Sequence, residues 1–458
     1  MKSLEAVKIK PIKVNSKNFF LIFLTLTYLG LVIWSYLTLI SPRYTYLGYI
    51  ANPRSPFIHC TSFLLALIPS LGLTKKVDRP SQVLIWFIYL LVLLPSLTVP
   101  FYATSLSSFK LIVYSCVTIA GFWILSFFSQ IPHFQEPRLR VSKTVFYFVA
   151  SILVVVFLCL LVKTFGFSLK WINFLDVYDV RANYKSSLKS AFGMVPYLVI
   201  WQGNVINPFL MVYGLSQRKW IWLLVGLVLQ LFIYSVTGLK SVSLSFLLVL
   251  CIFWGIGAKY KSNNFGTYLL TGASSLILIC VFLAKFFNFH LPLSFLVRRL
   301  IITPGLLTGF YWDFFATHPK AFLGHSLLKD LVEYPYSKSP PFIIGEMYFD
   351  NASTSANANF WADSFANFGL SGILMFSVLL GIFIWLFDSV SKPIDLRVSS
   401  TMLSVTGFSL INSALLTSLV THGLILTLMV MACLPTRKLQ LSTCSALVQK
   451  NDSNLMSD

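Results

Sequence analysis

Basic side chains with the spacing of an anion-binding face lie between two apolar stretches, in residues 167–191. Arg181, Lys185 and Lys189 are four residues apart, so a helix would place all three on one face. An arginine can hold a phosphate through two parallel hydrogen bonds. The pattern predicts a site for phosphate or pyrophosphate. Binding of anionic lipid headgroups is the alternative for the two lysines.

Further basic residues lie at the ends of other apolar stretches. Lys240 belongs to the turn TGLKS, at the expected start of a helix, where it could supply a point charge to an anion. Snorkelling of the lysine at the membrane surface is the alternative. Arg298 and Arg299 are adjacent, so in a helix they point about 100° apart and at most one need face a site. The Pro304-Gly305 pair is expected to break that helix.

Candidate acids and bases gather in and just after a large polar stretch, 288–358. The carboxyl and imidazole groups available there for proton transfer include Asp313, Glu346, Asp350, Asp363, His318 and His325. From this set we take Glu346, Asp363 and His325 as the candidate catalytic residues. Asp363 lies in the first turns of a long apolar helix, so a helix-capping role is its alternative.

Aromatic and amide side chains in the same region suit contact with sugars. Tyr311 and Trp312 belong to an amphipathic aromatic segment that could stack on sugar rings or lie at the membrane–water interface. The asparagines between 351 and 359 lie among small residues, which predicts close packing against a polar group. Asn357 and Asn359 are therefore the candidate sugar contacts, beside Tyr311 and Trp312.

The sequence shows no pattern typical of a metal site. HExxH-like spacing and Cys/His clusters are absent from the polar loops, and six of the seven cysteines lie within apolar stretches. We therefore expect neither a metal nor another cofactor, and no disulfide framework.

The elements that must position these side chains are long apolar helices. Hydrophobic residues make up 57% of the 458 residues and charged residues only 11%, outside the range of soluble domains. A bilayer core is crossed by about 20 apolar residues. About twelve stretches qualify, at 18–40, 57–73, 81–101, 108–130, 145–166, 192–215, 220–236, 241–258, 266–287, 359–387, 398–415 and 419–434. Their continuous runs predict an all-α polytopic membrane helix bundle and exclude a β-barrel.

The distribution of lysine and arginine predicts the orientation. Basic residues concentrate in the short loops of one side, so both termini are expected in the cytoplasm and the long loops 167–191 and 288–358 outside. The second loop would then separate the ninth and tenth spans. We expect a single membrane domain over 1–438, beginning with an uncleaved signal anchor, and a disordered cytoplasmic tail over 439–458. The net charge of +20 is a topology signal, since no compact basic domain could bind nucleic acid.

Four segments together resemble the bacterial oligosaccharide repeat-unit polymerases, the Wzy-type O-antigen and capsule polymerases. The resemblance covers residues 230–390. It lies in the order and spacing of TGLKS, RRLIITPGLLTGFYWDFFATHP, IGEMYF and ANANFWADSFANFGLSGILMFSVLLG. The amino-terminal half is similar only in topology and in its basic outer loop.

This resemblance implies a metal-independent glycosyltransferase in the inner (plasma) membrane. The growing chain leaves its polyprenyl pyrophosphate and is attacked by a hydroxyl of an incoming lipid-linked repeat unit. The resemblance places Arg181 and either Arg298 or Arg299 on the pyrophosphate, and we add Lys240. The implied partners are the polyprenyl-pyrophosphate-linked oligosaccharide and the lipid bilayer, with a chain-length regulator and a flippase as candidate partner proteins.

Two alternatives remain open. A flippase or transporter of lipid-linked sugars also suits about twelve spans with both ends inside. The spans contain no acid near their centres, which argues against an ion-coupled transporter. His422, in the last span, is interpreted as a residue that packs between helices. An O-antigen-ligase-like transferase would share the polymerase chemistry. The O-antigen ligases have a histidine on the external side. In this chain, His318 and His325 are the candidates for the corresponding residue. The first outer loop, 41–56, contains no acid, which argues against the metal-dependent membrane glycosyltransferases that use one there.

Overall fold

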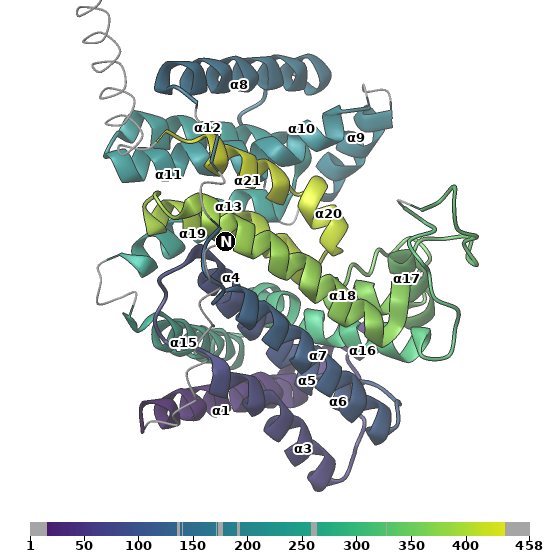
Figure 1. The fold of residues 1–458 in the computed structure, drawn as a ribbon. Helices are drawn as coiled ribbons and strands as arrows, with labels where there is room; N and C mark the ends of the chain where they lie inside the picture. Colours follow the sequence, from purple (N-terminus) through teal and green to yellow (C-terminus); the bar gives the residue numbers. More distant parts are fainter. Residues whose placement is uncertain are drawn as a thin grey trace, which may run out of the picture.

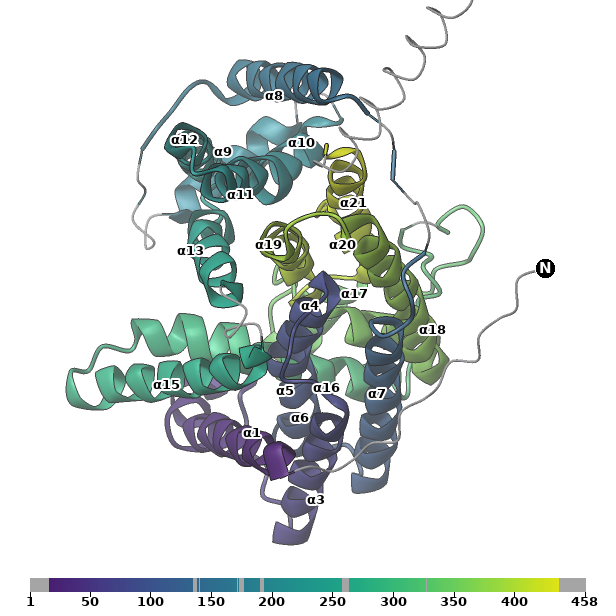
Figure 2. The same cartoon turned by 60° about the vertical axis from the view of Figure 1, so that its left-hand side comes forward.

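A computed structural model describes most of the chain. The described residues are 16–134, 138–139, 141–170, 172, 177–189, 193–257, 263–326 and 328–435. Every regular element within them is helical, as Figures 1 and 2 show, so the predicted all-α class is confirmed. The predicted tail over 439–458 lies outside the described residues.

The helices follow one another with short connections; η marks short π or 3-10 segments. The amino-terminal half contains α1 (Ser16–Ser35), η1 (Tyr36–Ile40), α2 (Ser41–Tyr44), η2 (Thr45–Leu47), α3 (Pro56–Leu67), η3 (Ile68–Gly72), α4 (Pro80–Ile88), η4 (Tyr89–Leu93), α5 (Leu94–Thr98), α6 (Pro100–Ala103), α7 (Ser108–Phe128), α8 (Lys143–Phe165), α9 (Val177–Lys189), α10 (Val195–Trp201), η5 (Gln202–Ile206) and α11 (Asn207–Gln217). The carboxy-terminal half contains α12 (Trp220–Thr237), α13 (Lys240–Ile256), α15 (Phe265–Phe286), η6 (Leu293–Ile302), α16 (Thr303–Phe315), α17 (Pro340–Phe349), α18 (Phe360–Ser391), α19 (Leu396–Gly407), η7 (Phe408–Ile411), α20 (Leu415–Val420) and α21 (Leu424–Cys433).

Ten of the described helical stretches are long and apolar enough to cross a membrane. They are Phe19–Leu47, Pro80–Ala103, Ser108–Phe128, Lys143–Phe165, Val195–Gln217, Trp220–Thr237, Phe265–Phe286, Leu293–Phe315, Phe360–Ser391 and Leu415–Cys433. Three shorter apolar helices accompany them, at Pro56–Gly72, Val242–Ile256 and Leu396–Ile411. The chain is therefore a multi-pass integral membrane protein. Each of the twelve predicted ranges coincides with one of these helices, and Leu293–Phe315 is additional.

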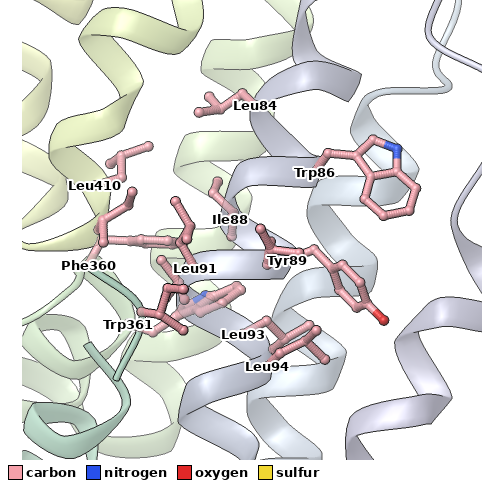
Figure 3. Packing of buried hydrophobic residues seen from close by; sticks show 14 of the residues in the cluster. Leu84, Trp86, Ile88, Tyr89, Leu91, Leu93, Leu94, Phe360, Trp361 and Leu410 are labelled. Carbon is pink, nitrogen blue, oxygen red and sulfur yellow. The ribbon is translucent and has the colours of Figure 1, made fainter. Parts of the chain in front are cut away.

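The central element is the continuous helix formed by α4, η4, α5 and α6. All of its apolar residues except the half-buried Phe87 are buried, because α18, α19, α16 and α7 surround it. Figure 3 shows Trp86 and Tyr89 of this helix in the same core as Trp361 of α18. A helix that is apolar on every side belongs at such a centre.

The peripheral element is α8, which lies at the edge of the molecule in both views of the fold (Figures 1 and 2). It is apolar all round, yet only Phe146 and Leu161 are buried within the protein. In a bilayer its exposed face contacts lipid, where exposure of an apolar surface carries no free-energy penalty.

A helix also occupies part of the segment predicted as one long polar loop. Residues Leu293–Phe315 form η6 and α16 without a break, so the expected interruption at Pro304-Gly305 is wrong. Pro304 lies where the π-helical turns of η6 pass into α16, and the neighbouring Thr303 Oγ1 donates to the carbonyl oxygen of Arg298 at 2.8 Å. Gly305 lets α16 approach α5, since a Cβ there would lie 2.3 Å from the carbonyl oxygen of Pro95. Among the described residues of this region, the irregular parts are 288–290 and the stretches on the two sides of α17.

The long helix α18 is interrupted at Gly369, whose φ of 66° lies in the left-handed region. The interruption frees carbonyl groups, and two of them are used by the segment that follows α16. Ala321 N donates to Ala366 O at 2.9 Å, and Phe322 N donates to Asn367 O at 3.3 Å. The irregular segment after α16 is therefore tied to α18.

Candidate functional site

The helix α9 docks on the turn that joins α12 to α13. Gly238 ends α12 with a φ of 61°, and its carbonyl oxygen accepts a hydrogen bond from Arg181 Nε at 3.1 Å. The Tyr234 hydroxyl in turn donates to the carbonyl oxygen of Ile172 at 2.6 Å. A Cβ at Gly238 would lie only 3.1 Å from Val177 O, so glycine allows the close approach. Arg181 is therefore held at the α12–α13 turn.

Lys240 begins α13 directly after this turn. Its Nζ lies 4.4 Å from the centre of the Phe295 ring, which belongs to η6. Burial lowers the pKa of Lys240, and the positive charges of Arg181 and Arg299 lower it further. Arg181 and Arg299, from two other segments of the chain, thus both lie within electrostatic reach of Lys240. We call Arg181, Lys240 and Arg299 the basic cluster.

The basic cluster concentrates positive charge. Within the described part of the chain, the ion pairs join Lys76 to Asp78, Lys338 to Glu346 and Arg397 to Asp395. None of these pairs involves Arg181 or Arg299. Like charges held together raise the free energy of the site, and a bound anion would lower it. Concentrated positive charge of this kind favours the binding of an anion such as phosphate.

Arg298 points away from the basic cluster, as expected for the neighbour of Arg299 on a helix. Its guanidinium carbon lies 4.4 Å from the Tyr44 ring centre and 5.6 Å from that of Tyr49. Its Nε and Nη2 donate to Ser294 Oγ at 3.2 and 2.8 Å. The residue is only 8% exposed. Of the two adjacent arginines, Arg299 belongs to the basic cluster, whereas Arg298 packs against Tyr44 and Tyr49 through cation–π contacts.

A buried amide network holds the start of α13 in place. Gln230 Nε2 donates to Val242 O at 2.9 Å, to Ser245 Oγ at 2.6 Å and to Gly203 O at 3.0 Å. Its Oε1 accepts from Asn207 Nδ2 at 2.9 Å. These bonds join α12, α13 and the π segment η5. They fix the position of the first turn of α13, and with it the position of Lys240.

The three predicted catalytic residues lie apart. Glu346 is exposed and pairs with Lys338 at 2.8 Å. Asp363 is buried in α18, where its Oδ2 accepts from Asn367 Nδ2 at 3.3 Å. His325 lies in the segment after α16, and burial lowers its pKa. Among the described contacts, no hydrogen bond or ion pair joins one of these three residues to another or to the basic cluster.

The four predicted sugar contacts occupy different environments. Tyr311 and Trp312 are fully buried, and the Tyr311 hydroxyl donates to Ala356 O at 3.2 Å. Asn359 caps α18, since its Oδ1 accepts from two amide groups of the first turn. Asn357 is the exposed member of the set. The structure thus gives three of the four a packing or capping position, and their contact with a sugar stays a prediction.

A pocket forms where the α6–α7 connection, the end of α16 and α17 meet. Its volume is about 310 Å³. It is lined by Ser105, Leu106, Ser107, Lys110, Asp313, Phe314, Thr317, His318, Met347 and Tyr348. We call it the Asp313 pocket. Sequence reasoning named Asp313 only as one of several acids, because nothing in the sequence brings Lys110 close to it.

The described residues contain no group of three or more His, Cys, Asp or Glu side chains that could hold a metal ion. In comparisons with known proteins, no family model, no curated protein and no solved structure matches the chain. Its function is therefore inferred from its own residues.

Proposed function

We propose that this protein is a membrane glycosyltransferase that polymerises polyprenyl-pyrophosphate-linked oligosaccharide repeat units. The observation that carries the proposal is the basic cluster. Arg181, Lys240 and Arg299 come from α9, α13 and η6. Arg181 is bonded to the α12–α13 turn, Lys240 follows that turn directly, and the charges of Arg181 and Arg299 both act on Lys240. A phosphate attached to a membrane lipid lies at this depth, just beyond the apolar core.

The chemistry of such a transfer fits fixed cations. When the glycosidic bond to the pyrophosphate breaks, negative charge develops on the leaving oxygen. Preorganised positive groups stabilise that charge without a further reorganisation cost. Arg181 and Arg299 offer planar forks for two phosphate oxygens, and Lys240 adds a point charge. The pyrophosphate leaving group supplies the driving force, so the reaction needs neither a nucleotide sugar nor a metal.

The proposal includes the orientation expected from the loop charges. In this orientation Leu293–Phe315 does not add a crossing to the twelve predicted spans, so the basic cluster faces the outside of the inner membrane and both termini lie in the cytoplasm. The acceptor is a hydroxyl of the incoming repeat unit, and Glu346, Asp363 and His325 remain the candidates for the group that removes its proton. An exposed carboxylate such as Glu346 can reach an acceptor without a rearrangement, whereas Asp363 would first have to be uncovered.

The test is polymerisation by purified protein in lipid nanodiscs, supplied with lipid-linked repeat units and excess chelator. We expect a ladder of products from the wild type. Arg181→Ala and Arg299→Ala should abolish the product ladder. Arg299→Lys should lower the amount of product nearly as much, because lysine lacks the planar fork. Arg43→Ala, at an exposed arginine of the first loop, is the matched control.

Three outcomes would contradict the proposal. A full ladder from both alanine variants at normal protein levels would remove the basic cluster from the reaction. A ladder that is lost in chelator and restored by magnesium would refute the role of fixed cations in place of a metal. Movement of the lipid-linked unit across the bilayer without any ladder would favour a flippase.

A further inference from the structure

The Asp313 pocket has the side chains of a carbohydrate site. Asp313 Oδ2 accepts a hydrogen bond from the Tyr348 hydroxyl at 2.7 Å, which fixes the carboxylate. The Tyr348 ring is itself held by stacking on Phe310, with ring centres 4.3 Å apart. A half-buried, oriented carboxylate is a strong acceptor for the hydroxyl groups of a ligand.

The remaining polar groups of the pocket extend this pattern. His318 Nδ1 lies 2.9 Å from the carbonyl oxygen of Phe314 and 3.1 Å from Thr317 Oγ1. The carbonyl oxygen can only accept, so this contact favours the tautomer with the proton on Nδ1. In the neutral ring, Nε2 is then an acceptor. The hydroxyl groups of Ser105, Ser107 and Thr317 also line the pocket and can both donate and accept. Several acceptors beside several hydroxyls suit a ligand rich in hydroxyl groups.

The charge of the pocket argues against a phosphate. Lys110 and Asp313 contribute one positive and one negative charge to its lining. A carboxylate repels a phosphate group, whereas a neutral sugar can use both residues. The volume of about 310 Å³ lies at the lower end of the range for small-ligand sites. The pocket therefore differs in chemistry from the basic cluster.

One continuous helix connects the two sites. Arg299 lies in η6 and Asp313 in α16, and the helix runs unbroken between them. They are separated by roughly 14 residues, or about 21 Å along the axis. In Figure 1, α9 beside the basic cluster and α17 beside the pocket both lie on the right-hand side of the molecule. A ligand that reaches from one to the other must be extended, as an oligosaccharide is.

We propose that the Asp313 pocket binds a neutral sugar of the oligosaccharide at a distance from the reacting pyrophosphate. Asp313 and the Nε2 of His318 accept hydrogen bonds from the sugar hydroxyls, and Lys110 donates to one. The identity of the ligand rests on the proposed function, but the chemistry of the pocket does not. Binding here would hold the chain in place while its lipid-linked end reacts.

The experiment measures binding of a free repeat-unit oligosaccharide, released from its lipid and carrying no phosphate, by saturation-transfer NMR on protein in nanodiscs. We expect the wild type and Arg299→Ala to bind equally. Asp313→Asn should bind about tenfold more weakly, since it loses a charge-assisted hydrogen bond. Lys110→Met should also weaken binding. Asp330→Asn makes the same substitution at an exposed carboxylate and is the control.

The outcomes separate this inference from the proposed function. Unchanged binding in Asp313→Asn, or no binding by the wild type, would overturn the pocket assignment. If binding is lost in Arg299→Ala and kept in Asp313→Asn, the glycan binds at the basic cluster and the inference is wrong, while a product ladder could still form. If binding depends on Asp313 but lipid-linked units give no ladder, the pocket stands and the polymerase function fails. Melting curves of each variant exclude misfolding as the cause.

Discussion

Replacing Asp388 by alanine should destabilise the fold more than a similar change at the surface. Asp388 lies near the end of α18 and is 1% exposed. Its carboxylate accepts from Ser81 N at 2.9 Å and from Ser81 Oγ at 2.5 Å. Ser81 is in the first turn of α4, where backbone N–H groups have no partner within the helix. The carboxylate thus caps one membrane helix from another.

The magnitude follows from these two bonds. A hydrogen bond to a charged group contributes about 1.5–3 kcal/mol, so Asp388→Ala should cost about 3–6 kcal/mol of unfolding free energy. Ser81→Ala removes one of the two bonds and should cost about 1.5–3 kcal/mol. Each single substitution already removes the hydrogen bond between Ser81 Oγ and the Asp388 carboxylate. The second substitution cannot remove this bond again. The double variant should therefore cost less than the sum of the single variants, by the energy of that bond.

The assay is reversible unfolding in mixed micelles, titrated with dodecyl sulfate and followed by tryptophan fluorescence. Asp395→Ala is the matched control, because Asp395 caps α19 by accepting from Arg397 N at 2.8 Å but is exposed. An exposed cap contributes about 0.5–2 kcal/mol. If Asp388→Ala costs no more than Asp395→Ala, or if the double variant is additive, the capping of α4 by α18 does not stabilise the fold as described.

Two further perturbations probe the surroundings of the sites. Gly238→Ala should lower the unfolding free energy by about 1–2 kcal/mol and loosen the docking of α9, because residue 238 has a φ of 61°. The measurements are the melting temperature and the affinity for lipid-linked substrate, and both should fall. Burial lowers the pKa of Lys320 to about 8 from 10.5, so between those values the unfolded chain binds more protons and stability should rise with pH. The rise should vanish in Lys320→Met and persist in Lys329→Met, measured by melting from pH 7.5 to 10.5; an equal rise in both would contradict it.

The membrane helices were predictable because their signal is local. Each apolar run of the required length carries its own hydropathy, and a backbone in lipid has no alternative to the helix. The short helix Val242–Ile256 was found by the same rule as the long ones. Burial within the bundle was not predictable, since α8 and α4 are both strongly apolar. One faces lipid and the other lies at the centre because of contacts that hydropathy does not encode.

The helix Leu293–Phe315 was missed for two physical reasons. Arg298 and Arg299 lower its mean hydropathy, although Arg298 is buried between tyrosines. Pro304-Gly305 is an ordinary helix-breaking pair, but here the glycine provides a close contact with Pro95. Small residues serve this purpose in membrane helices, where backbones must approach one another. A turn signal taken from soluble proteins is therefore ambiguous within an apolar region.

Local spacing predicted the separation of Arg298 from Arg299, but not which of them would join Arg181. That depends on Lys240, whose position is fixed by the docking of α13 against α12 and η5. The Asp313 pocket is harder still, because Lys110 and Tyr348 come from distant parts of the chain.

Asn359 shows what a polar residue beside an apolar run means in this protein. An asparagine directly before a helix is a capping signal, and Asn359 does cap α18. It also donates to Thr308 Oγ1 at 2.7 Å, so it joins α18 to α16. Sequence reasoning assigned it to a sugar because it lies in a polar stretch. In a membrane protein the ends of helices need polar partners as much as a ligand does, so a buried amide at a helix start is first a structural group. Charged residues for which no capping bond accounts, Arg299 foremost, are the better guide to chemistry.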